Sequence, residues 1–127
     1  GDIHEASVHG LQGVPVVEHA REPEGEWDQS APIRFRAETD RVFQQVPDEL
    51  MLQAPALGRT VTLRTSNSRS TIVWNPWPNK TARLSQMHAD DWQSFVCVES
   101  ANAFENAVRL APGASHEMTL TLSVASD

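Results

Sequence analysis

Apolar and polar residues alternate along most of this chain. In residues 60–66, apolar Val61 and Leu63 alternate with Thr62 and Arg64, and residues 117–125 follow the same rhythm. A period of two is typical of strands that bury one face, so both segments are predicted strands. Further strands are expected at residues 14–20, 40–45, 49–53, 70–74, 94–101 and 107–110. Helical spacing is confined to one expected turn at residues 88–93.

Turn-forming residues separate the expected strands at short intervals. Examples are Pro47-Asp48, Asn67-Ser68 and Pro112-Gly113, while the polar residues 21–32 are expected to form a long surface loop. Many short strands joined by such turns predict an all-β fold, an antiparallel β-sandwich. Because no composition shift or repeat marks a boundary, residues 1–127 are expected to form a single β-sandwich unit.

Composition narrows the classes of function. The chain has 127 residues and a net charge of -7, which argues against nucleic acid or an anionic membrane surface as its partner. Its single cysteine, Cys97, rules out an internal disulfide, and residues 1–10 lack the features of a signal peptide, so a cytoplasmic location is expected. The five histidines have no metal-binding spacing, and neither a metal nor a cofactor is expected.

The segment VWNPWPNK, residues 73–80, is unusually rich in tryptophan and proline. Its prolines fix the backbone of a turn. One interpretation is a rigid turn with Trp74 and Trp77 in the core. The other is a loop that offers indole rings and the amide of Asn75 to a hydroxyl-rich ligand, with Lys80 near an anion. The pattern alone leaves both open.

Two acidic positions also allow two interpretations. Asp40 and Arg41 are adjacent at the start of a strand, so their side chains point to opposite faces. In one interpretation Asp40 caps a turn and Arg41 is solvated. In the other, both belong to a functional site. In the segment FVCVES, residues 95–100, Glu99 shares a strand face with Phe95 and Cys97. Cys97 is expected to be a buried, inert thiol. Because desolvation makes a carboxylate more basic, Glu99 is either a general base or a salt-bridged strand end.

Four segments resemble one family of enzymes. TDRVF (39–43), STIVWNPWPNK (70–80), FVCVES (95–100) and LAPGASHEMTLTLSV (110–124) occur in this order and spacing. The chain is similar to the C-terminal part of the glucose-6-phosphate 1-epimerases, or hexose-6-phosphate mutarotases, of the aldose 1-epimerase superfamily. The resemblance implies a galactose mutarotase-like sandwich that binds a hexose or hexose 6-phosphate on a concave face.

The same resemblance implies roles for individual residues. Glu99 matches the family's general base for interconverting α and β anomers, and Asp40 matches the aspartate that holds sugar hydroxyls. Arg41 belongs to the same motif as Asp40, and Asn75 and Trp77 of the WNPW motif are expected to bind substrate. The family's acid is a histidine in a His-Thr-Tyr-Phe motif that this chain lacks.

The missing acid shapes the remaining expectations. The chain is expected to be the C-terminal half of the enzyme, weak or inactive alone, and to pair with a copy of itself or with the missing N-terminal half. An alternative is a non-catalytic carbohydrate-binding module in which Trp74 and Trp77 stack on sugar rings. A β-sandwich interaction domain that binds no sugar is a third possibility.

Overall fold

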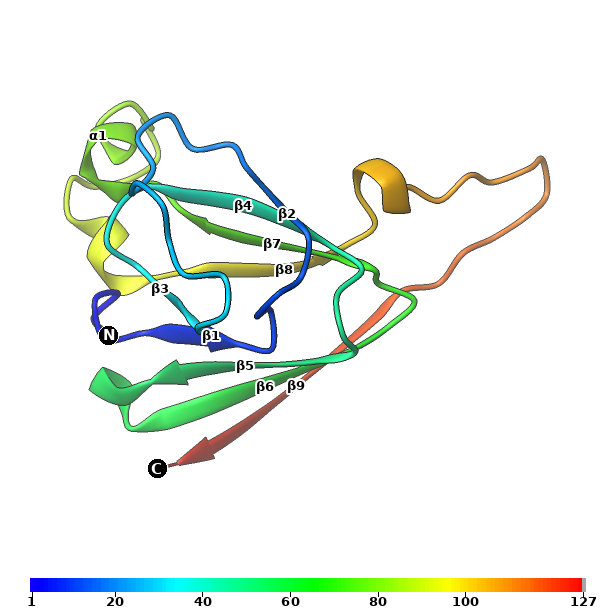
Figure 1. The fold of residues 1–127 in the computed structure, drawn as a ribbon, viewed down its shortest axis with the longest axis horizontal. Coiled ribbons are helices and arrows are strands. Elements are labelled where there is room, and N and C mark those ends of the chain that lie inside the picture. The colour runs from blue at the N-terminus through cyan, green and yellow to red at the C-terminus, as the bar shows by residue number, and fades with distance from the viewer. Residues whose placement is uncertain (127) are drawn as a thin grey trace.

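A computed structural model of the chain describes residues 1–126 as two antiparallel sheets packed face to face (Figure 1). The five-stranded sheet has the order β3-β1-β5-β6-β9, and the four-stranded sheet has the order β2-β4-β7-β8. The first comprises β1 (Ser7–His9), β3 (Ile33–Arg34), β5 (Glu49–Ala54), β6 (Arg59–Ser66) and β9 (Thr119–Ser126). The second comprises β2 (Val16–Glu18), β4 (Thr39–Gln44), β7 (Ser70–Asn75) and β8 (Cys97–Ala101). The predicted all-β sandwich is confirmed.

The core lies between the two sheets. Phe43 of β4 and Val73 of β7 are fully buried there, opposite Leu50 and Leu63 of the five-stranded sheet. Ile33, Phe35 and other residues of the first half complete the cluster, which consists of Ile3, Ala6, Val8, Leu11, Ile33, Phe35, Phe43, Leu50, Leu63 and Val73. Alternation in β4 and β7 thus decides which face of the four-stranded sheet turns inward.

The opposite face of the four-stranded sheet, called here the outer face, carries a different set of side chains. Paired residues of antiparallel strands point to the same side. Asp40 pairs with Trp74, and Trp74 pairs with Cys97. One rung further, Ile72 pairs with Glu99. Since the residues between them in sequence face the core, all of these side chains belong to the outer face.

Short helical segments close the ends of the sandwich. The α-helix α1 (Trp77–Thr81) follows β7, and single 3-10 turns occur at η1 (Pro55–Leu57), η2 (Asp91–Ser94) and η3 (Phe104–Asn106). The turn expected at 88–93 appears as η2, whereas α1 was not anticipated. No helix among residues 1–126 is long and apolar enough to cross a membrane.

Several expected strands differ from the observed ones. The strand expected at 107–110 is wrong, because this segment belongs to a long connection that projects away from both sheets and has no strand to pair with (Figure 1). The strand expected at 94–101 begins only at Cys97, after η2. β1 and β3 were missed because strands of three and two residues show no alternation.

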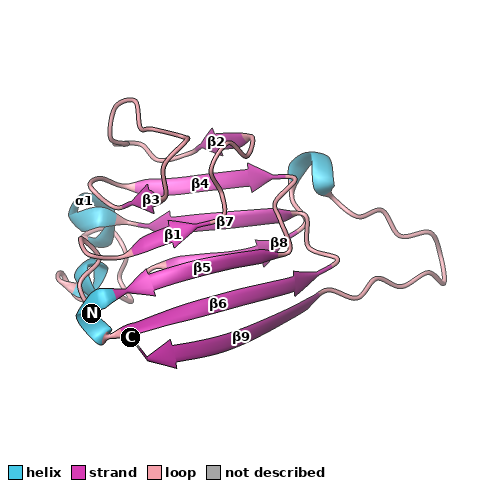
Figure 2. Ribbon diagram, turned by 60° about the horizontal axis from the view of Figure 1, so that its bottom comes forward, coloured by secondary structure: helices cyan, strands magenta, loops and turns pink. Residues whose placement is uncertain are grey.

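β9 was expected to bury one face, yet all its residues are exposed. It lies at the edge of the five-stranded sheet with β6 as its one neighbour (Figure 2). Leu122 pairs with the core residue Leu63, so Leu122 points inward, but it is 58% exposed. The inner side of this edge therefore extends beyond what the four-stranded sheet covers.

Candidate functional site

The outer face brings Asp40 and Glu99 onto one surface. Neighbouring strands lie about 4.8 Å apart and residues rise about 3.4 Å along a strand. Asp40 on β4 and Glu99 on β8 are two strand spacings and two residues apart, with β7 between them, so their Cα atoms lie about 12 Å apart. Trp74 and Ile72 of β7 form the floor between them. Two carboxylates therefore flank an aromatic and aliphatic strip.

Glu99 is exposed, not buried among apolar groups. β8 is the last strand of the four-stranded sheet and has a neighbour, β7, on one side. Glu99 forms no ion pair within the described residues 1–126. The apolar setting expected from FVCVES is thus corrected, and so is the salt-bridged strand end. The carboxylate is instead free to meet a ligand.

Cys97 and Glu99 share one face of β8, as expected, because they pair with Trp74 and Ile72 of β7. Desolvation raises the pKa of the Cys97 thiol, and the negative charge of Glu99 raises it further. The sequence predicted a buried, inert thiol, but Cys97 is only half-buried. A thiol with a raised pKa nevertheless stays protonated and is a poor nucleophile.

Trp74 supplies an aromatic surface on the outer face. Its ring centroid lies 5.7 Å from that of Phe95, and the Lys80 Nζ lies 6.0 Å from the Trp74 centroid. Trp74 is partly exposed and pairs with Asp40. The resemblance to the epimerases placed Trp77 among the substrate-binding residues, and Trp74 was expected to contact sugar only in the alternative of a carbohydrate-binding module. Along β7 the side chain of Trp74 points to the opposite face from Val73 and to the same face as Asp40. This alternation is the signal that could have identified Trp74.

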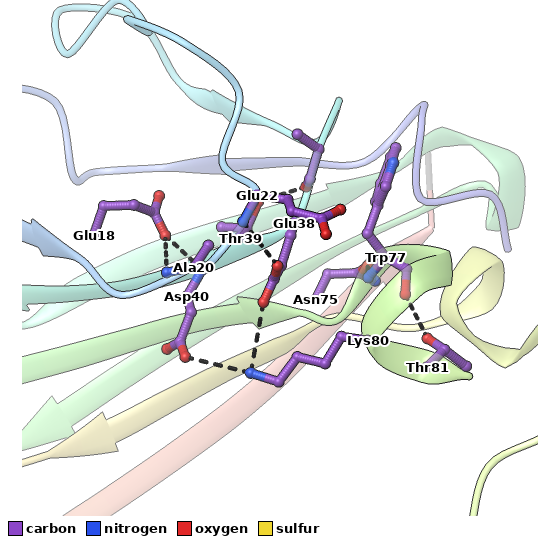
Figure 3. Close-up of polar contacts among 11 residues, drawn as sticks. Glu18, Ala20, Glu22, Glu38, Thr39, Asp40, Asn75, Trp77, Lys80 and Thr81 are labelled. Atoms are coloured by element: carbon purple, nitrogen blue, oxygen red, sulfur yellow. Dashed lines mark hydrogen bonds and ion pairs between the residues drawn. The ribbon is translucent and has the colours of Figure 1, made fainter. Parts of the chain in front are cut away.

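Trp77 lies in a different place, in an aromatic cluster at the end of the sandwich. Its ring centroid is 4.6 Å from that of Trp92 and 5.3 Å from that of His4. Trp77 also packs against the hydrophobic core. The side chains of Trp77 and Lys80 thus extend from different sides of α1 (Figure 3).

Asn75 is fully buried, and its side-chain amide forms hydrogen bonds with backbone groups. Its Nδ2 donates to the carbonyl oxygens of Trp92 and Phe95, both at 2.9 Å, and its Oδ1 accepts from the Trp77 N–H at 2.9 Å. These bonds tie the end of β7 to the start of α1 and to the segment that leads into β8. The amide has no contact with the outer face.

Arg41 points into the sandwich, because it lies two residues from the core residue Phe43 on β4 and shares its face. It is 3% exposed, its Nε donates to Glu18 Oε2 at 2.7 Å, and its guanidinium lies 4.0 Å from the Trp27 ring centroid. The solvated side chain suggested by the sequence is therefore corrected. Arg41 cannot contact a ligand on the outer face, and its neighbour Asp40 can.

Lys80 connects α1 to β4 beside Asp40 (Figure 3). Its Nζ lies 3.6 Å from Glu38 Oε1 and 3.9 Å from Asp40 Oδ2. Glu38 is buried, and its Oε2 accepts the backbone N–H of Glu22 at 3.1 Å. The end of the outer face thus combines a cation, an accessible carboxylate and an indole ring.

Comparisons with known proteins agree on one family. A family model described as aldose 1-epimerase matches residues 1–123. Two similar proteins carry the provisional name glucose-6-phosphate 1-epimerase. The protein from Cenchrus ciliaris is 26% identical over 96% of this chain and 37% of its own length. The protein from Escherichia coli K12 is 30% identical over 83% of this chain and 35% of its own length.

A solved structure shares the fold. The crystal structure of HI1317 superimposes with a TM-score of 0.71 at 21% identity, covering 98% of this chain and 42% of that one. The chain spans about a third of the length of the relatives named above, at 37% and 35%.

Proposed function

The chain belongs to the aldose 1-epimerase family, and we propose that it provides the sugar-binding sheet and the general base of a hexose-6-phosphate 1-epimerase. The observation that carries this proposal is the outer face, on which Asp40 and Glu99 flank Trp74 and Ile72. The provisional name of the relatives supports glucose 6-phosphate as the substrate. An isomerase of this kind needs no redox partner.

In the proposed mechanism, Glu99 removes the proton from the C1 hydroxyl of the sugar. The C1–O5 bond breaks as an acid gives a proton to the ring oxygen O5, and the open chain carries an aldehyde at C1. Rotation about the C1–C2 bond presents the other face of the aldehyde, and the ring closes as both protons return. Acid and base are thus restored and no atom is gained or lost.

Asp40 accepts hydrogen bonds from ring hydroxyls in this proposal. Arg41, Asn75 and Trp77 act instead as positioning residues, because their contacts lie inside the sandwich or at its end. Arg41 holds β4 against Glu18 of β2, and Asn75 holds the segment before β8. These contacts on the inner side of the sheet therefore hold in place the strands that carry Asp40 and Glu99.

The proposed acid is a histidine in a segment that this chain does not contain. The open flank of the sandwich is a place for such a segment to pack. Leu120, Leu122 and Val124 of β9 are exposed on its inner side, and an apolar cavity of about 250 Å³ lies between Val61 and Phe95. We propose that this flank pairs with the complementary segment, or with a second copy when that segment is absent. A monodisperse monomer without a second peptide, by light scattering and native mass spectrometry, would count against pairing.

The proposed activity is tested by magnetisation exchange between the α and β anomers of glucose 6-phosphate in NMR spectra. A polypeptide that joins this chain to a segment with the histidine motif is expected to accelerate exchange over buffer. The chain alone is expected to be slower by a factor of about 10² to 10⁴, the usual contribution of one acid or base. Sugar binding by the joined polypeptide with an exchange rate equal to that of buffer would overturn the epimerase and favour a carbohydrate-binding module.

A further inference from the structure

Lys80 has hydrogen-bonding capacity that the protein does not use. Its Nζ lies 3.6 Å from Glu38 Oε1 and 3.9 Å from Asp40 Oδ2. Charge-assisted hydrogen bonds from nitrogen to carboxylate oxygen are shorter, at about 2.7–2.9 Å. The two carboxylates therefore attract the ammonium without taking its N–H groups, and no hydrogen bond from Nζ occurs within residues 1–126.

Glu38 explains why Lys80 is held at this position. The Glu38 side chain is 4% exposed, and its Oε1 is buried without a hydrogen-bond partner in the described part of the chain. A buried carboxylate is stable only beside a compensating charge. Lys80 supplies that charge, so Glu38 anchors the ammonium, and the 31% of the lysine side chain that stays exposed leaves it accessible from solvent.

The surroundings of Lys80 match the chemistry of a sugar ring. Its Nζ lies 6.0 Å from the centroid of the Trp74 ring, and Trp74 pairs with Asp40 across β4 and β7. An indole presents a flat apolar surface to the C–H groups of a pyranose. A carboxylate accepts hydrogen bonds from hydroxyl groups, and an ammonium donates to them.

We propose that Lys80 and Asp40 bind two adjacent ring hydroxyls of the hexose above Trp74, with Lys80 as the donor and Asp40 as the acceptor. This inference rests on the proposed sugar site of the outer face and adds the residues that recognise the ring. Two carboxylates, those of Glu38 and Asp40, lie near the single cation of Lys80. A phosphate group is repelled there, so the 6-phosphate of the substrate points away from Lys80.

Two variants separate sugar binding from structural support. Lys80→Met keeps the apolar stem of the side chain but leaves Glu38 without its cation, so it is expected to lower both thermal stability and affinity. The double variant Lys80→Met/Glu38→Gln removes both charges and is expected to recover the stability. Since a hydrogen bond to a charged group is lost in both, the Kd for glucose 6-phosphate is expected to rise about 10-fold or more in both.

The measurement is an NMR titration of each variant and the wild type with glucose and with glucose 6-phosphate. The same fold-change for both sugars is expected, because Lys80 binds ring hydroxyls that both possess. Wild-type affinity in the double variant would reduce Lys80 to a structural partner of Glu38 and overturn the inference. A loss confined to glucose 6-phosphate would show that Lys80 binds the phosphate and would also overturn it. If the wild type bound neither sugar, the proposed function itself would fail.

Discussion

Replacing Glu99 by glutamine is expected to lower kcat for glucose 6-phosphate anomerisation by about 10² to 10⁴-fold, with little change in KM. The amide has nearly the size of the carboxylate but cannot accept the proton of the C1 hydroxyl. Glu99 is exposed on the edge strand β8 and holds no ion pair in the described residues, so the substitution removes no structural contact. A loss in kcat alone is the signature of a group that acts in the transition state.

Glu5→Gln is the matched control for this variant. Glu5 is exposed in the turn before β1, a strand of the five-stranded sheet, and its replacement is expected to leave kcat unchanged. Anomer exchange with each variant of the joined polypeptide measures both values. Wild-type kcat in Glu99→Gln would remove Glu99 from the mechanism.

Cys97 reports independently that the Glu99→Gln variant is folded. The charge of Glu99 contributes to the raised pKa of the Cys97 thiol, so its removal lowers that pKa. More thiolate is then present at a fixed pH below the pKa, and alkylation of Cys97 becomes faster. Because burial still raises the pKa in the folded variant, the rate stays below that of the denatured chain.

Replacing Asn75 by aspartate is expected to destabilise the fold by roughly 2–5 kcal/mol, since each buried group left unsatisfied costs about 1–3 kcal/mol. The Asn75 amide donates to the carbonyl oxygens of Trp92 and Phe95 from a fully buried position. An aspartate cannot donate to either oxygen, and its charge is buried beside them. Urea unfolding, with the midpoint and slope compared to wild type, measures the loss.

Asn67→Asp is the control for this change. Asn67 also donates from Nδ2 to a backbone carbonyl, that of Glu117, but it is exposed. The expected change is within about 0.5 kcal/mol, as for most surface substitutions. Equal effects at the two positions would show that burial of the Asn75 bonds contributes nothing. A selective loss at Asn75 supports its role in holding the segment before β8, and so in placing Glu99.

Local pattern was enough to predict the longer strands and which of their side chains share a face, although it missed the short strands β1 and β3. The alternation in residues 60–66 and 70–74 corresponds to β6 and β7. The parity of FVCVES placed Cys97 and Glu99 on one face, and the register of β8 with β7 confirms it. These features depend on neighbours along the chain, which a period of two records directly.

The burial of single residues depended on tertiary contacts that no local pattern contains. Glu99 is exposed because β8 ends its sheet, and Arg41 is buried because Glu18 and Trp27 meet it inside. The bonds of Asn75 reach the backbone of Trp92, 17 residues away in sequence. The motifs therefore located the segments that carry these side chains but could not tell which side chains lie on the outer face and which point inward.

The most direct test of the outer face as the sugar site is an NMR titration of the isotopically labelled chain with glucose 6-phosphate. We expect the largest backbone amide shifts at Asp40, Trp74, Cys97 and Glu99, with the Trp74 indole N–H also strongly shifted. Residues of the five-stranded sheet are expected to stay unchanged. Shifts confined to that sheet, with the amides of Asp40 and Glu99 unshifted at saturating sugar, would show that the outer face does not bind the sugar.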